Sequence, residues 1–571
     1  MTSDILKTQT PLTIDRRHDL DALRAIAMLA GIALHGLLSF MPMPEGAWPV
    51  RDDFQSELFG VVMAAIHGFR MPLFFLISGF FTAMLWRKRG LRSLIHHRFK
   101  RIFLPLAIGM VTIIPLTWAA IIGVAIASAA SNSAKPDNVD LYSMTTTVEA
   151  EKLWADADGE LDLNQYDTRF QMPPITHAVI YGRPDITRWL IEKGADVNKR
   201  SGDGSVPLTS AVFFGRAESA KLLIDAGAAL TSQNIRGDGL KEVMEAPWAF
   251  TAPIASLLSV EVDKTEVETG RAEIAKLIDW DQVESQTPVE EAGDGQIDKI
   301  VGTFVFLGMI PVFHHLWFLW FLCWLVAAFV VYAAFATRFP RAKLPEFVIV
   351  SPLRYAWLIP LTLLPQMFMG LLYPVFGPDT SSGIVPLPHL LFYYGIFFFF
   401  GALYFDCDDT EGRLGRNWKW TLPIALFVVF PLGYQLTLGG FGFGKEWLDP
   451  AWHRSVSVAT QVIYVWLMTF GSVGFFRVFY SNESRTMRYV SDSSYWLYLV
   501  HLPVIMVAQY LVRHWQLPAI VKWSIVCVVV SGLLLLSYQW FIRYTPIGTL
   551  LNGRRQRPSK NSEPAVAIVA E

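Results

Sequence analysis

The chain alternates long apolar stretches with shorter polar connections. An α-helix needs about 20 mainly apolar residues to cross the ~30 Å hydrocarbon layer of a membrane. Stretches of this kind predict ten membrane-spanning helices, at residues 20–41, 59–86, 102–128, 313–336, 354–375, 387–405, 419–438, 455–479, 493–512 and 519–543. An even number of spans places both termini on the same side of the membrane.

Basic side chains gather in every second connection, and this bias predicts the orientation. The basic groups are Arg16 and Arg17 before the first span, seven residues between Arg87 and Arg101, then Arg338, Arg341 and Lys343, and finally Arg554, Arg555 and Arg557. Cytoplasmic loops carry such an excess of lysine and arginine. We therefore expect a multi-pass protein of the inner (plasma) membrane with cytoplasmic termini, and residues 131–298 on the outer, periplasmic side.

Residues 131–298 have a different composition, with 30 acidic and 15 basic side chains. Within them, "PPITHAVIYGRPDITRWLIEKGADVNKR" from Pro173 aligns with "VPLTSAVFFGRAESAKLLIDAGAALTSQ" from Val206 at a spacing of 33 residues. The period and the helix-turn-helix pattern resemble ankyrin repeats. A degenerate third copy, "GRAEIAKLIDW", begins at Gly270. The pattern predicts a soluble helical domain over about 150–285, interpreted as a spacer or a docking module for a protein partner.

Composition sets the class of the whole protein. Hydrophobic side chains make up 53% of the 571 residues and aromatic side chains 14%, which is typical of a polytopic membrane protein. The predicted fold is all-α: a membrane domain in two parts, 1–130 with three spans and 299–545 with seven, the inserted domain 131–298, and a disordered cytoplasmic tail at 546–571. The polar N-terminus predicts no cleaved signal peptide. Three cysteines suggest no disulfide framework, and nothing suggests a nucleic-acid partner.

The first span, "LDALRAIAMLAGIALHGLLSF", carries an arginine and a histidine, although an ionisable group in lipid costs several kcal/mol unless it faces protein or water. Arg24 and His35 are eleven residues apart, so three helical turns place them on one face about 16 Å from each other. This predicts a buried face, with Arg24 near the cytoplasmic surface and His35 in the outer half of the membrane.

Three further spans contribute basic or polar groups. The second carries His67 and Arg70 on one face, with Ser78 deeper; the fourth begins with His314 and His315; the ninth carries Tyr495, Tyr498 and His501. No aspartate or glutamate lies deep inside these spans, and Asp21 is at the boundary. Such a cluster favours an anionic ligand with a histidine acting as general base. The alternatives are histidines that only hydrogen-bond neighbouring helices, an arginine that reaches the interface, and three histidines that bind a metal ion.

Five motifs carry a resemblance to a known family. They are "RAIAMLAGIALH", "FRMPLFFLISGFF", "HHRFKRIFLPL", "HLWFL" and "YWLYLVHLP", in this order along the chain. Together they resemble the acyltransferase family 3 integral membrane proteins, over residues 15 to about 130 and 300 to 550. The usual members lack the insert, which stands on the side where the acceptor should arrive.

The resemblance implies transfer of an acyl group, succinyl or acetyl, from cytoplasmic acyl-CoA to a hydroxyl of an exported glycan, with no bound cofactor and no metal. It makes His35 the catalytic base, and adds Arg24 and Arg70 as catalytic residues. Ser78, His315, Trp317, Tyr498 and His501 match the remaining motif positions, and their roles in substrate binding are less defined. His67, which shares a helix face with Arg70, is a further candidate for substrate binding. Two alternatives remain open: a transporter or flippase of an anionic or acylated lipid intermediate, and a membrane-anchored ankyrin interaction protein.

Overall fold

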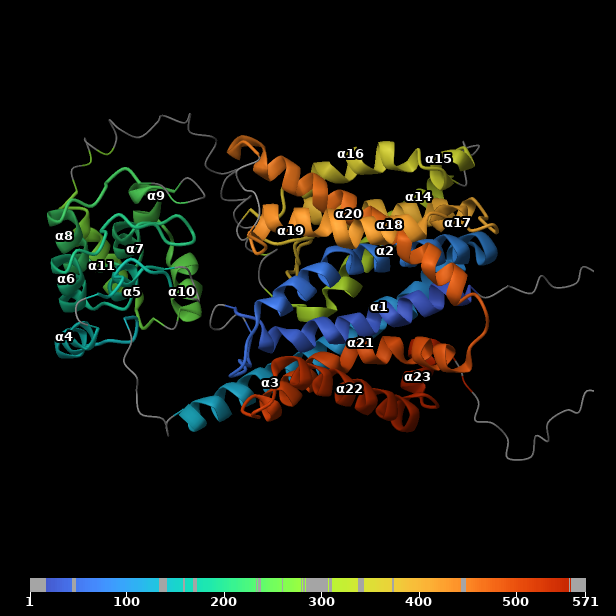
Figure 1. The fold of residues 1–571 in the computed structure, drawn as a ribbon, viewed down its shortest axis with the longest axis horizontal. Coiled ribbons are helices and arrows are strands. Elements are labelled where there is room, and N and C mark those ends of the chain that lie inside the picture. The colour runs from blue at the N-terminus through green and yellow to red at the C-terminus, as the bar shows by residue number, and fades with distance from the viewer. Residues whose placement is uncertain are drawn as a thin grey trace, which may run out of the picture. The chain divides into compact units, whose positions relative to one another are not determined.

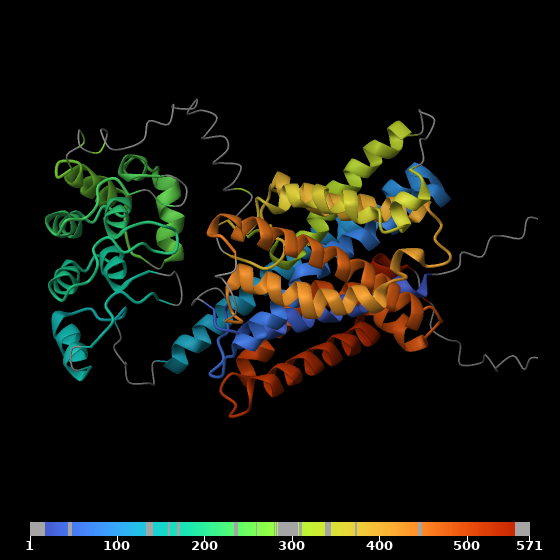
Figure 2. The same cartoon turned by 45° about the horizontal axis from the view of Figure 1, so that its top comes forward.

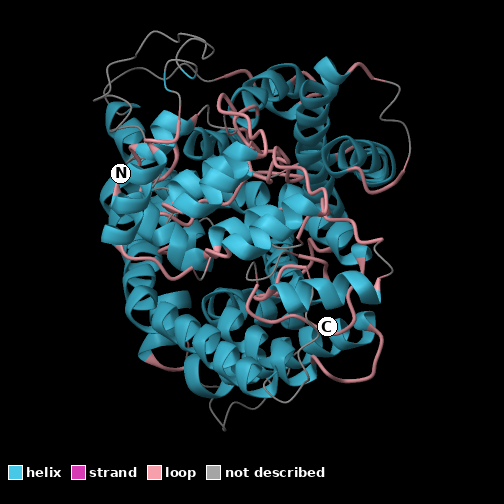
Figure 3. Ribbon diagram, turned by 90° about the vertical axis from the view of Figure 1, so that its left-hand side faces the viewer, coloured by secondary structure: helices cyan, strands magenta, loops and turns pink. Residues whose placement is uncertain are grey.

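A computed structural model gives the fold of the chain. It describes residues 17–43, 48–132, 141–157, 160–167, 172–232, 234, 238–258, 260–278, 280, 283, 307, 311–336, 344–371, 374–442, 448–553 and 555. Contacts divide the chain into two compact units, one of Met1–Pro42, Val50–Ile126 and Gln296–Glu571 and the other of Met43–Pro49 and Ala127–Gly295. Every regular element in the described residues is a helix (Figure 3). The all-α prediction is confirmed.

The first unit consists mainly of long apolar helices. They are α1 (His18–Leu37) with the short turn η1 (Leu38–Phe40), α2 (Glu57–Arg98), η2 (Phe99–Phe103), α3 (Leu104–Asn132), η3 (His314–Leu316), α14 (Trp317–Ala336), α15 (Glu346–Val350), α16 (Arg354–Gln366), α17 (Pro388–Asp406), η4 (Arg413–Gly415), α18 (Trp418–Ile424), η5 (Ala425–Val429), α19 (Phe430–Leu438), α20 (Pro450–Phe479), α21 (Arg485–Val512), α22 (Ala519–Ser537), η7 (Tyr538–Ile542) and α23 (Pro546–Asn552).

Among the described residues, eight helical stretches are long and apolar enough to cross a membrane. One of them, Glu57–Ser128, is 72 residues long and contains both the second and the third predicted spans. The predicted span 354–375 corresponds instead to α16, a helix of 13 residues with two internal prolines. At 1.5 Å per residue it is about 20 Å long. Together the helices make the chain a multi-pass membrane protein.

The long stretch from Glu57 bends where the sequence predicts a basic connection. Gly90 has φ 78° and ψ 172°, a backbone conformation that glycine adopts without steric cost. The helix resumes at once, and η2 adds a π-helical turn before α3. The second and third spans are therefore joined by helix rather than by an irregular loop.

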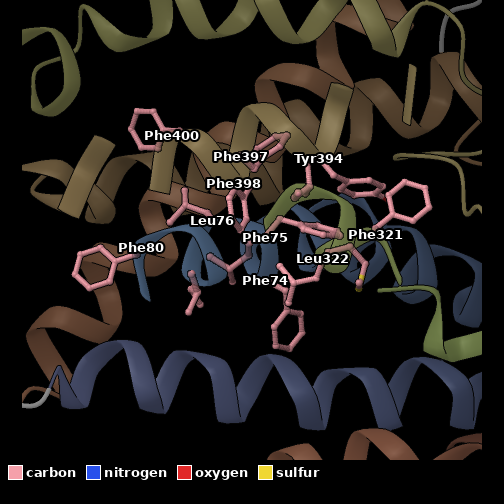
Figure 4. Close-up of a cluster of buried hydrophobic side chains, with 14 of the residues drawn as sticks. Phe74, Phe75, Leu76, Phe80, Phe321, Leu322, Tyr394, Phe397, Phe398 and Phe400 are labelled. Carbon is pink, nitrogen blue, oxygen red and sulfur yellow. The ribbon is translucent and has the colours of Figure 1, made fainter. Parts of the chain in front are cut away.

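Helices α2 and α17 pack with their backbones almost touching. A Cβ atom on Gly79 would lie 1.7 Å from the carbonyl oxygen of Phe398, and one on Gly401 would lie 1.9 Å from that of Leu76. Small residues permit such close approach between membrane helices. Around this contact α2, α14 and α17 contribute a buried aromatic cluster, in which the rings of Phe75 and Tyr394 pack with their centroids 4.6 Å apart and their planes tilted by 34° (Figure 4).

Helix α1 is central to the first unit. It packs against α2, α20, α21 and α22, and it lies between α2 and α21 in Figure 1. Figure 2 shows the same fold turned by 45°. Beyond the C-terminal end of α1 a buried ion pair ties the loop before α2 to α22: Lys522 Nζ donates to Asp52 Oδ1 at 2.5 Å. Both side chains are almost fully buried, at 0% and 1% exposed. The neighbours of α1 are thus held in place around it.

The second unit contains paired short helices, as the repeat predicts. They are α4 (Thr147–Asp156), α5 (Pro174–Ile180), α6 (Pro184–Glu192), α7 (Pro207–Phe213), α8 (Ala217–Asp225), α9 (Leu240–Met244), α10 (Trp248–Leu257) and α11 (Lys264–Ile274). Pairs α5–α6 and α7–α8 occupy the two aligned copies and share one apolar core. The Arg271 guanidinium on α11 donates to the carbonyl oxygens of Val212, Phe213 and Ala246. The segment predicted as a third copy therefore packs on the second copy, but it does not repeat its local structure: Gly270 lies inside α11, whereas Gly215 has φ 65° in the turn before α8.

The predicted tail begins with a helix. Asn552 in α23 donates to the Asp492 carbonyl oxygen at 2.6 Å, which ties α23 to α21. The prediction of disorder for the rest of the tail falls on residues 556–571, outside the described residues.

Candidate active site

The predicted face of α1 is turned towards α21 and α2. Arg24, two turns into the helix, donates from Nη2 to Ser491 Oγ at 2.9 Å and approaches Asp21 at 3.4 Å. Three turns further on, His35 Nδ1 lies 3.0 Å from His501 Nε2. Arg24 and His35 therefore both contact α21, at opposite ends of the face that they share.

Three histidines meet at the His35 end. The ring of His501, which is 2% exposed, lies 4.9 Å from the His35 ring and 5.2 Å from the His315 ring, measured between centroids. His315 Nε2 is 3.0 Å from the Leu499 carbonyl oxygen, and Tyr498 donates its hydroxyl to the His315 carbonyl oxygen at 2.7 Å. Residues from three distant parts of the sequence thus form one buried polar cluster.

Arg70 brings a positive charge to this cluster. Its guanidinium lies directly over Gly31, one turn before His35, because a Cβ atom at Gly31 would be only 1.9 Å from Arg70 Nη1. The side chain is half-buried, and Nε has no hydrogen-bond partner among the described residues. No carboxylate in the described chain pairs with it. The cation is therefore available to an anionic group that enters from outside the protein.

A cavity of ≈ 650 Å³ lies between α1, α2, α14 and α21. Six arginine and lysine side chains and two carboxylates line it, together with His97: they are Arg24, Lys88, Arg89, Arg98, Arg101 and Arg555, with Asp21 and Asp492. The remaining wall is largely apolar and includes Phe74, Ser78 and Phe318. An elongated ligand with an anionic end and an uncharged arm fits this distribution of charge.

The cavity stops one helical turn short of the histidine cluster. Tyr498 is part of its lining, whereas His35 and Arg70 are not. The Tyr498 ring also lies 6.4 Å from the His501 ring. Tyr498 therefore separates the basic cavity from the polar cluster.

The other predicted residues occupy different surroundings. His67, one turn before Arg70, has its Nε2 2.8 Å from the carbonyl oxygen of Pro378 in the irregular segment between α16 and α17. Trp317 packs against Phe75 and Tyr394 in the aromatic cluster. His67 thus contacts the segment between α16 and α17, and Trp317 packs against α2 and α17. Ser78 lines the cavity. The described residues contain no group of three or more metal-ligating side chains placed to hold an ion.

Sequence reasoning missed Gly31, Ser491 and Gln509. The Gln509 amide donates to the carbonyl oxygens of His35 and Gly36 at 3.0 and 2.9 Å, and it is fully buried. Gln509 could have been found, because an amide in an apolar span needs a partner. Gly31 gives no such signal, since its role depends on a side chain from another helix.

Comparisons with known proteins identify the domains of the chain. A family described as an acyltransferase domain matches residues 17–140 and 243–539, and ankyrin repeats match residues 175–224. Glucans biosynthesis protein C of Escherichia coli strain SMS-3-5 / SECEC is 36% identical over 106 residues, and the proteins of the same name from Escherichia coli K12 and Shigella dysenteriae serotype 1 are 35% identical. The matched stretch is 19% of this chain and 26% of each relative, so the chain spans about a quarter of the length of these relatives. Since the domain match covers more than half of the chain, the protein belongs to the membrane acyltransferase family and carries ankyrin repeats in addition.

Proposed function

We propose that the protein is a membrane O-acyltransferase that moves an acyl group from acyl-CoA to a hydroxyl of a glycan. The observation that carries the proposal is the meeting of His35 and Arg70 beside a cavity with a basic end. The relatives named for glucan biosynthesis make an exported glucan the acceptor that we test first. The succinyl group is the first donor to test, with the acetyl group as the alternative.

The basic end of the cavity suits the phosphates of coenzyme A. Arginine makes charge-assisted, often bidentate hydrogen bonds with phosphate, and Arg24, Arg98 and Arg101 lie in the wall. The orientation predicted from the basic loops puts this end on the cytoplasmic side, where acyl-CoA is found. The uncharged pantetheine arm would lie along the apolar wall towards Tyr498. The Tyr498 side chain must then change its rotamer for the thioester to reach His35.

The chemistry follows from the side chains in the cluster. Neutral His35 takes the proton of the acceptor hydroxyl as its oxygen attacks the thioester carbonyl carbon. Arg70 stabilises the negative charge that develops on the carbonyl oxygen, in a site that is largely shielded from water. When the intermediate collapses, the C–S bond breaks, the acyl–oxygen bond remains, and His35 returns its proton to the coenzyme A thiolate.

The test is mass spectrometry of cell-envelope glycans from cells with the wild-type protein, without it, and with His35→Ala. We expect an added acyl mass only with the wild type. His389→Gln is a matched control, because His389 on α17 contacts Phe368 and lies outside the cluster. Wild-type acylation by His35→Ala at equal protein level contradicts the mechanism. Movement of an unmodified glycan or lipid intermediate would instead support a transporter.

We further propose that the ankyrin unit docks a protein partner or presents the acceptor, and takes no part in catalysis. Deleting residues 131–298 tests this. Transfer to a small soluble acceptor should continue, while acylation of the natural glycan should change. If the variant without residues 131–298 still inserts into the membrane but transfers no acyl group, the proposal is contradicted.

A further inference from the structure

His501 is held in one tautomer by two backbone carbonyl groups. Its Nδ1 lies 2.8 Å from the Tyr498 carbonyl oxygen and 3.1 Å from that of Leu497. A carbonyl oxygen only accepts hydrogen bonds, so Nδ1 must carry the proton. Neutral His501 therefore has its lone pair on Nε2.

The tautomer of His501 sets that of His35. His501 Nε2 lies 3.0 Å from His35 Nδ1, and an acceptor on His501 requires His35 Nδ1 to donate. In a neutral imidazole only one nitrogen carries a proton. The basic lone pair of His35 is then on Nε2, the nitrogen that does not face His501.

We propose that His501 is a positioning residue that holds His35 with its proton on Nδ1 and its basic atom at Nε2. This inference rests on the proposed function, in which His35 is the base. When His35 takes the acceptor proton it becomes an imidazolium, and its Nδ1–H bond to His501 becomes charge-assisted and therefore stronger. His501 thus stabilises the protonated base while remaining neutral itself.

A neutral partner suits this site better than a carboxylate. The Arg70 guanidinium lies one turn from His35, and a buried carboxylate beside His35 would attract it strongly at low dielectric. The cation would then be neutralised before any substrate arrived. A histidine orients His35 and leaves Arg70 available to the developing oxyanion.

The neighbours of the pair keep it in place. His315 donates from Nε2 to the Leu499 carbonyl oxygen, and its ring stands nearly perpendicular to that of His501, at 85°. The titratable and charged groups around His35 are Arg70 from α2, His501 and Tyr498 from α21, His315 from η3 and, against the adjacent Gly36, Cys527 from α22. Removing His501 takes away one partner of His35, which also hydrogen-bonds the backbone of Gly31, without adding or removing a fixed charge.

The kinetic test compares His501→Ala, His501→Gln and the control His389→Gln. Glutamine can offer its Oε1 where the histidine offers Nε2, so it should restore part of the hydrogen bond. We expect kcat to fall about 10²-fold for the alanine variant, within the range of general-base catalysis, and no more than about tenfold for the glutamine variant. The pH at which kcat is half-maximal should move in the alanine variant and remain in the control. Equal losses for alanine and glutamine with an unchanged pH profile contradict the proposal.

A second measurement does not depend on activity. ¹⁵N spectra of histidine-labelled full-length protein in membranes distinguish the two tautomers, and comparison with His35→Gln and His501→Ala assigns the signals. We expect both histidines to carry the proton on Nδ1 in the wild type. A proton on Nε2 of His35 overturns the inference, whether or not the protein transfers acyl groups. Confirmed tautomers in a protein without transferase activity would contradict the proposed function alone.

Discussion

Replacing Gly31 by alanine tests the position of Arg70 with a single methyl group. The added Cβ would lie 1.9 Å from Arg70 Nη1 and 3.2 Å from Cζ, whereas ordinary van der Waals contact begins at 3.4 Å. Arg70 Nη1 must therefore move about 1.5 Å away from the new methyl group. Because it is the end of a flexible side chain, it can move without disturbing the backbone of α2.

The expected effect is on catalysis and not on folding. Alanine is favoured over glycine inside a helix by about 0.8–1.0 kcal/mol, so α1 should be at least as stable as before. A displacement of about 1 Å in a catalytic group can cost about 10²-fold in rate, which is ~2.7 kcal/mol of transition-state stabilisation. We predict that kcat/KM falls by about this factor in Gly31→Ala.

The assay is transfer of a labelled acyl group from acyl-CoA to glucan in membrane vesicles, normalised to protein amount. Gly532→Ala on α22 and Gly123→Ala on α3 are matched controls, since a Cβ atom at either position meets nothing within 4 Å. Both should keep wild-type activity, and all three variants should keep the wild-type melting temperature. Wild-type kcat/KM in Gly31→Ala would show that Arg70 does not act from the position over Gly31.

Three further predictions concern the basic cavity, the end of that cavity next to the histidine cluster, and the packing around α1. Arg24→Gln should raise KM for acyl-CoA about tenfold or more, with a smaller change in kcat, because it removes one charge-assisted bond to the donor; an unchanged KM would exclude Arg24 from donor binding. Tyr498→Ala should join the cavity to the histidine cluster and increase acyl-CoA hydrolysis without acceptor, measured as free thiol; hydrolysis at the wild-type rate would contradict its separating position. Lys522→Met should destabilise the protein by about 3–5 kcal/mol, because it leaves Asp52 buried without its lysine partner. The double variant Lys522→Met with Asp52→Leu should recover most of that stability. Thermal unfolding in detergent measures both variants, and equal melting temperatures for the single and the double variant would contradict this view of the pair.

The spans and the repeats were predictable because their signals are local. Apolar stretches of the right length mark the helices, and a spacing of 33 residues marks α5 to α8. The spacing of Arg24 and His35 likewise fixes their shared face, because helical geometry alone determines it. The prediction was least accurate for the span at 354–375, where α16 ends at Gln366, one residue after Pro365.

The contacts of the site depend on long-range packing and could not be read from spacing. His35 and His501 are 466 residues apart in the sequence, and which nitrogen faces which is set by the rotation of α21 about its own axis. Gly31 matters only because the Arg70 side chain crosses from α2 to α1. His67 could be placed near Arg70 by its spacing, but its contact with the Pro378 carbonyl oxygen depends on the path of an irregular segment.

The most direct measurement uses proteoliposomes that contain the purified full-length protein, with labelled acyl-CoA on the side of the basic cavity and glucan on the other side. We predict label in the glucan across the bilayer for the wild type, and at least about 10²-fold less for His35→Ala. Equal labelling by His35→Ala, or transfer that requires both substrates on one side, would contradict a centre at His35 and Arg70 that connects the two faces of the membrane.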